Sequence, residues 1–66
     1  MVVVLKPNAP IEKRNELIRE IESMGVKVQV TEGTETSILG IIGDTSNLNR
    51  YRIASHDIVA NILRVQ

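Results

Sequence analysis

Two short stretches of this 66-residue chain carry aliphatic residues at both odd and even positions, a pattern that constrains the fold more than any other feature. The first, residues 1–5, is a run of Met, Val and Leu that ends at Lys6-Pro7. The second, residues 36–43, consists mainly of Ile, Leu and Gly. Short apolar runs bounded by Pro and Gly are typical of buried strands. We therefore predict two central strands with apolar side chains on both faces.

The segment between these stretches indicates first a helix and then a strand. The apolar residues of the helix recur at helical spacing, and they are Ile11, Leu17, Ile18, Ile21 and Met24. Asn8 is the expected cap, and Gly25 is the expected stop signal. Residues 26–31 alternate Val with Lys, Gln or Thr, as in a strand with one buried and one solvated face.

The last third of the chain indicates a second helix and a final strand. Residues 44–46, Asp-Thr-Ser, have the chemistry of a helix N-cap. The expected apolar positions of this helix are Leu48, Tyr51 and either Ile53 or Ala54. Residues 55–57 should end it, and residues 58–65 should form the last strand.

These elements follow the order βαββαβ within one α+β domain, residues 1–66. A right-handed crossover places the second strand parallel to the first, which leaves room for the third strand between them. The predicted fold is therefore a ferredoxin-like sandwich with an antiparallel sheet of order 4-1-3-2. Both helices should cover the same face of the sheet.

The predicted fold leaves one sheet face without helices, and the central strands should make that face apolar. Gly40 adds a position where another backbone or a ligand can approach closely. A contiguous apolar patch beside polar edge residues is typical of an interaction surface. We expect homo-oligomerisation or docking onto a larger domain. The predicted interface residues are Val3, Leu5, Leu39 and Ile41.

Composition argues against several classes of function. Lys plus Arg equals Asp plus Glu at 8 each, and Tyr51 is the sole aromatic residue, so we expect no nucleic-acid partner. The longest apolar run, residues 1–5, is far too short for a membrane span, so we expect no membrane partner. The absence of Cys fits a cytoplasmic location.

Nothing in the sequence predicts catalysis by this chain alone. Its single His, His56, lies between Ser55 and Asp57, and consecutive side chains diverge instead of forming a relay. The spacing of a metal site is absent, so we predict no metal ligand, no cofactor and no catalytic residue. The segment 40–44 lacks the spacing of a phosphate-binding loop.

Three segments of the chain resemble a known family. Residues 3–7, Val-Val-Leu-Lys-Pro, residues 33–44 with the run Gly-Ile-Ile-Gly-Asp, and residues 63–65 look like the N-terminal ferredoxin-like domain of certain 3-deoxy-D-arabino-heptulosonate 7-phosphate (DAHP) synthases. The resemblance extends over essentially all 66 residues. It implies an ACT-like regulatory module preceding a (β/α)₈ barrel that condenses phosphoenolpyruvate with erythrose 4-phosphate, the first step of the shikimate pathway of aromatic amino-acid biosynthesis.

The resemblance also implies a ligand and a mode of regulation. The domain would bind Tyr or Phe between domains of neighbouring subunits, and their pairing would close access to the barrel. By position, Gln29 and Thr31 would lie at this ligand interface, where family members can have His and Ser. The barrel would begin beyond Gln66, so the chain is either an excised regulatory domain or a free-standing relative.

Two other functions remain open from the sequence. A structural or oligomerisation module without a small-molecule ligand would form an oligomer that no ligand changes. An enzyme acting alone would need a pocket with convergent polar groups, which the sequence does not predict.

Overall fold

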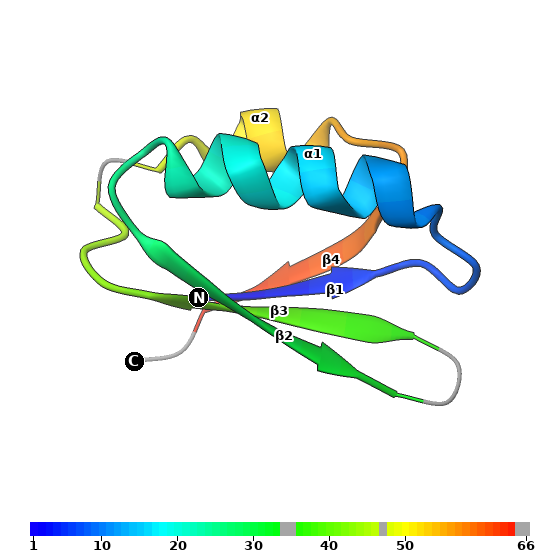
Figure 1. Ribbon diagram of the computed structural model, residues 1–66. Coiled ribbons are helices and arrows are strands. Elements are labelled where there is room, and N and C mark those ends of the chain that lie inside the picture. The colour runs from blue at the N-terminus through cyan, green and yellow to red at the C-terminus, as the bar shows by residue number, and fades with distance from the viewer. Residues whose placement is uncertain (34–35, 47, 65–66) are drawn as a thin grey trace.

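The computed structural model describes residues 1–33, 36–46 and 48–64, which form a four-stranded sheet with two helices on one face (Figure 1). The elements are β1 (Val2–Leu5), α1 (Ile11–Glu22), β2 (Lys27–Glu32), β3 (Ser37–Ile42), α2 (Arg50–Ala54) and β4 (Val59–Leu63). The strand order is β2-β3-β1-β4, and all neighbouring strands are antiparallel. This confirms the predicted ferredoxin-like topology. Neither helix, among the residues described, is long and apolar enough to cross a membrane.

The register of the sheet determines which aliphatic residues meet the helices. Val3 lies opposite Leu39 on β3 and opposite Ile62 on β4, whereas Val2 lies opposite Gly40 and Leu63. Residues directly opposite each other on neighbouring strands point to the same face. The side chains of Val3 and Leu39 therefore share one face with Ile62, and Val2 belongs to the other.

The helix-covered face holds the core, and this corrects the predicted interface. Val3, Leu5, Leu39 and Ile41 were expected on the open face, but all four are buried, with Val3 and Leu39 at 0% exposure. They cluster with Leu17 and Ile21 of α1 and Ile53 of α2. The central strands are aliphatic on both faces, so the sequence pattern alone could not show which half meets the helices.

The ends of α1 differ in part from the prediction. Pro10 occupies the N-cap position without a side-chain hydrogen bond, and Asn8 instead adopts a left-handed conformation with φ 64° in the preceding loop. Gly25 has φ 91°, so it ends the helical segment as predicted. Ile11 was expected in the apolar stripe but is exposed in the first turn.

The second helix is short and begins later than predicted. The Asn49 side chain caps it by accepting a hydrogen bond from the backbone N–H of Arg52 at 3.2 Å. The expected cap residue Asp44 closes its own turn, accepting from the N–H and hydroxyl of Ser46 at 3.0 and 2.7 Å. Tyr51 was expected at an apolar position, but it is 84% exposed.

Candidate functional site

The helix-free face of the sheet is the main candidate site, and we call it the open face. Register places the following residues on it: Val2, Val4, Lys27, Gln29, Thr31, Ile38, Gly40, Ile42, Asn61 and Leu63. Ile38, Ile42 and Leu63 are 39%, 56% and 47% exposed, and Val2 and Val4 between them are partly buried. The open face is therefore a contiguous aliphatic surface with polar residues at its borders.

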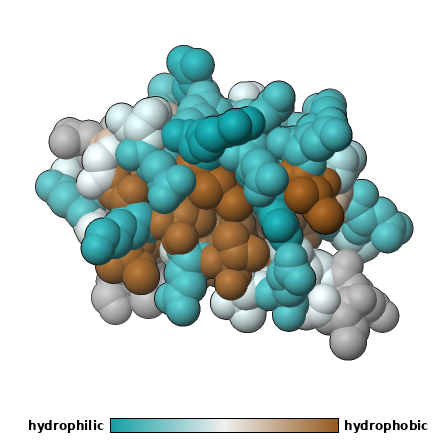
Figure 2. Space-filling view, viewed as in Figure 1, coloured by the Kyte–Doolittle hydropathy of each residue, from teal (hydrophilic) through white to brown (hydrophobic). Residues whose placement is uncertain are grey.

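A second group of exposed apolar side chains lies along the β2 edge of the sheet. Figure 2 shows apolar side chains gathered below the hydrophilic outer surface of α1 on this side of the molecule. Val30 of this edge strand lies opposite the buried Leu39, so its side chain is on the helix side of the sheet, and it remains exposed. Among the residues described, β2 pairs only with β3, so the backbone groups on its outer edge have no partner strand there. An unprotected edge of this kind can accept another chain.

Gly40 lies at the centre of the open face and carries no side chain there. It lies opposite Val2 on one side and Gln29 on the other. A Cβ built at this position would meet only the carbonyl oxygen of Gln29, at 3.7 Å, which is an ordinary contact. The chain's own packing therefore does not require a glycine here, and the space is accessible from outside.

Gln29 and Thr31 border this aliphatic surface, as the sequence predicted for the solvated side of this strand. They are exposed, and they lie opposite Gly40 and Ile38 of β3. Within the described part of the chain, neither side chain forms a hydrogen bond. An amide and a hydroxyl two residues apart on one face can both donate and accept hydrogen bonds to a ligand.

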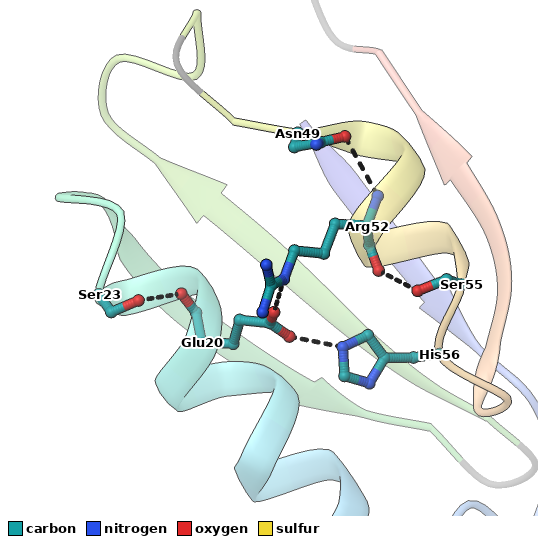
Figure 3. A network of polar contacts seen from close by, with 6 residues as sticks. All are labelled: Glu20, Ser23, Asn49, Arg52, Ser55 and His56. Carbon is teal, nitrogen blue, oxygen red and sulfur yellow. Dashed lines mark hydrogen bonds and ion pairs between the residues drawn. The ribbon is translucent and has the colours of Figure 1, made fainter.

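His56 belongs to a cluster of polar side chains between the two helices (Figure 3). Its Nε2 lies 2.5 Å from Oε2 of Glu20, and Oε1 of Glu20 accepts from Nε of Arg52, so this cluster joins α1 to the end of α2. The Ser55 hydroxyl donates its hydrogen bond to the Arg52 carbonyl at 2.6 Å. The hydrogen bond from Arg52, and then that of His56, lower the pKa of Glu20 below its ordinary value of 4.5.

A hollow of about 310 Å³ lies between α2 and β4. Arg50 and Asn61 are its most polar lining residues beside Tyr51. The described residues that line it include no carboxylate pair and no nucleophile beside a base. No cluster of three or more His, Cys, Asp or Glu side chains suited to a metal occurs among the residues described.

Comparison with known proteins agrees with the sheet and helix arrangement over the whole chain. The family described as "DAHP synthase ferredoxin-like domain" matches residues 1–66. The phospho-2-dehydro-3-deoxyheptonate aldolase of Thermotoga maritima is 34% identical over 65 residues, which cover 98% of this chain. A crystal structure of the Thermotoga maritima phospho-2-dehydro-3-deoxyheptonate aldolase (DAHP synthase) superposes with a TM-score of 0.89 at 32% identity over 98% of this chain.

The match covers only a small part of these relatives. The chain spans 19% of the curated Thermotoga maritima protein and 19% of the chain in the crystal structure. The full-length family match, the identity above 30% and the shared topology agree with one another. This chain belongs to the family of DAHP synthase ferredoxin-like domains.

Proposed function

We propose that this chain is a regulatory domain of a DAHP synthase, and that it senses an aromatic amino acid where two such domains meet. The observation that carries the proposal is the open face, an aliphatic surface bordered by the unused polar groups of Gln29 and Thr31. The activity implied by the related enzyme, condensation of phosphoenolpyruvate with erythrose 4-phosphate, would belong to a fused or associated (β/α)₈ barrel. Such a protein would work in the cytoplasm.

The chemistry of the open face suits an aromatic amino acid. A phenyl or phenol ring can rest on aliphatic side chains over Gly40, where no side chain intervenes. Gln29 and Thr31 can hydrogen-bond the polar groups of the ligand. Lys27 lies on the same face of β2, two residues before Gln29, and supplies a cation for the ligand carboxylate. The face thus combines apolar area, hydrogen-bonding groups and one positive charge.

Regulation follows if the ligand binds the paired domains more tightly than the separate ones. A ligand shifts an equilibrium only by its differential affinity for the two states. Typical couplings of about 1–3 kcal/mol correspond to changes of about 5–150-fold in an equilibrium constant. Pairing through the open face would then hold the domains in a position that restricts access to the barrel.

Ligand-dependent dimerisation tests the proposal. Sedimentation velocity of the chain should show a larger dimer fraction with millimolar Tyr or Phe than without. The double variant Gln29→Ala and Thr31→Ala should lose this response, whereas Asn15→Ala, at an exposed position of α1, should keep it. An unchanged distribution with Tyr, Phe and Trp alike would contradict sensing by this domain.

The exposed Ile42 and Leu63 also favour a second candidate, an oligomerisation module without a small-molecule ligand. This candidate predicts an oligomer that forms in buffer alone and does not respond to aromatic amino acids. The same sedimentation series separates the two, because only the sensor responds to the ligand.

A further inference from the structure

A polar hollow of about 200 Å³ lies where the loop between β1 and α1 meets the β2–β3 hairpin. Its lining includes Lys6 and Asn8 from the loop, Arg14 from α1, and Gly33, Thr36 and Ser37 from the hairpin. Ser37 lies two residues before the buried Leu39 on β3, so it belongs to the helix side of the sheet. The hollow is therefore separate from the open face and independent of the proposed function.

The hollow is rich in hydrogen-bond donors. Lys6 and Arg14 are cationic, Asn8 carries an amide, and Thr36 and Ser37 carry hydroxyls. None of the described residues that line it is acidic. Glu32 lies at the margin, where its Oε1 accepts from Nη1 of Arg14 at 2.6 Å. Among the described residues around the hollow, one carboxylate therefore lies beside two cations, which is an excess of positive charge.

Arg14 is held in place and has an unsatisfied donor. Its side chain is only 17% exposed, and the bond to Glu32 fixes one end of the guanidinium group. Nε of Arg14 is buried and has no hydrogen-bond partner in the part of the chain that the structure describes. A buried donor without a partner is costly, and most such groups in folded proteins are paired. Arg14 itself lines the hollow, so an acceptor bound there can receive hydrogen bonds from the accessible N–H groups of its guanidinium.

We propose that this hollow binds a small oxyanion, a carboxylate or phosphate group, between Arg14, Lys6 and Ser37. Charge-assisted hydrogen bonds from a guanidinium group to such oxygens are shorter and stronger than neutral ones. The volume is below the range of about 300–1,000 Å³ that is usual for whole drug-sized ligands. The hollow therefore accommodates the anionic group of a small molecule, while the rest of that molecule would extend into solvent.

An NMR titration of the isotopically labelled chain tests the binding. Inorganic phosphate and, separately, acetate should each be added against sodium chloride at matched ionic strength. We expect saturable shifts of the Arg14 Nε–H and the Ser37 backbone amide with at least one oxyanion, and the better of the two identifies the chemistry. Equal shifts with chloride, shifts that never saturate, or shifts centred elsewhere would overturn the proposal.

Three variants test which residues bind the oxyanion. Arg14→Lys keeps the charge but removes the planar guanidinium group with its several N–H donors. Lys6→Gln removes an exposed charge without touching the core. Each should weaken binding about tenfold, the loss expected for one hydrogen bond to a charged group. Lys13→Gln, an equal change of charge at an exposed position of α1, should leave the affinity unchanged. If Arg14→Lys perturbs the hairpin, Lys6→Gln alone tests the site. Wild-type affinity of Lys6→Gln for the oxyanion would refute the proposed site.

Discussion

Ile38 and Leu39 are neighbours on β3 whose side chains lie on opposite faces of the sheet, so a substitution at each tests the assignment of the two faces. Leu39 is completely buried, and Leu39→Ala removes its isopropyl group from the core. Such a change costs about 2–5 kcal/mol. A domain of this size is stabilised by only about 3–5 kcal/mol, so the variant should lose most of its stability.

Ile38→Thr should change stability little but should weaken association. Its side chain is 39% exposed, and Thr retains the β-branched shape that suits a strand. We expect a loss of about 1 kcal/mol or less in the free energy of unfolding. If pairing buries the exposed part of Ile38, however, the same substitution should weaken dimerisation about tenfold.

Urea unfolding followed by circular dichroism measures the first effect, and sedimentation equilibrium measures the second. The reasoning requires a large stability loss for Leu39→Ala, and a small stability loss with weakened association for Ile38→Thr. A larger stability loss at Ile38 than at Leu39 would refute the assignment of faces. Unchanged association in Ile38→Thr would refute the open face as the docking surface.

Three further predictions concern the helices and the centre of the open face. Glu20→Gln should lower stability by about 1 kcal/mol at neutral pH, whereas Glu22→Gln should not, and equal urea midpoints of Glu20→Gln and the wild type at pH 7 would contradict this. Because Arg52 lowers the pKa of Glu20, the stabilisation is present above pH 4.5 and is lost as pH falls through the pKa of Glu20 in the folded state. Asn49→Ala should cost about 1 kcal/mol through loss of the α2 cap, and an unchanged melting temperature would show that the cap contributes nothing. Gly40→Ala should preserve or raise stability, since the added Cβ meets no close atom, but it should reduce the dimerisation response to Tyr in sedimentation. A destabilised variant would show that the fold itself needs a glycine at this position.

The topology could be predicted because each element carries a distinct local signal. The order of elements follows from the alternation in residues 26–31, the helical stripe through Leu17 and Ile21, and the Pro and Gly boundaries. The right-handed crossover rule then leaves little choice for the order of strands. Gln29 and Thr31 were placed on the correct face for the same reason, since their strand has only one apolar side.

The facing of the central strands could not be predicted, because a residue and its neighbour are equally aliphatic there. Val2 and Val3 differ only in register, and register depends on pairing with β3 and β4. A shift of one residue moves every side chain to the other face. The prediction of a helix cap at Asp44 was wrong for a similar reason, since an Asx turn and a helix N-cap use the same side-chain chemistry. The hollow beside Arg14 could not be predicted from the sequence, because Lys6 and Ser37, which line it together with Arg14, are distant from each other in the chain.

Methyl-resolved NMR with a soluble paramagnetic reagent tests most directly whether the open face is where two domains meet around an aromatic ligand. In the free chain, the methyl groups of Ile38, Ile42 and Ile11 should all be accessible to the reagent, because all three side chains are exposed. Adding Tyr should shield Ile38 and Ile42 while Ile11 on α1 remains accessible. Continued access to Ile38 and Ile42 at saturating Tyr, or shielding of Ile11 instead, would contradict the account.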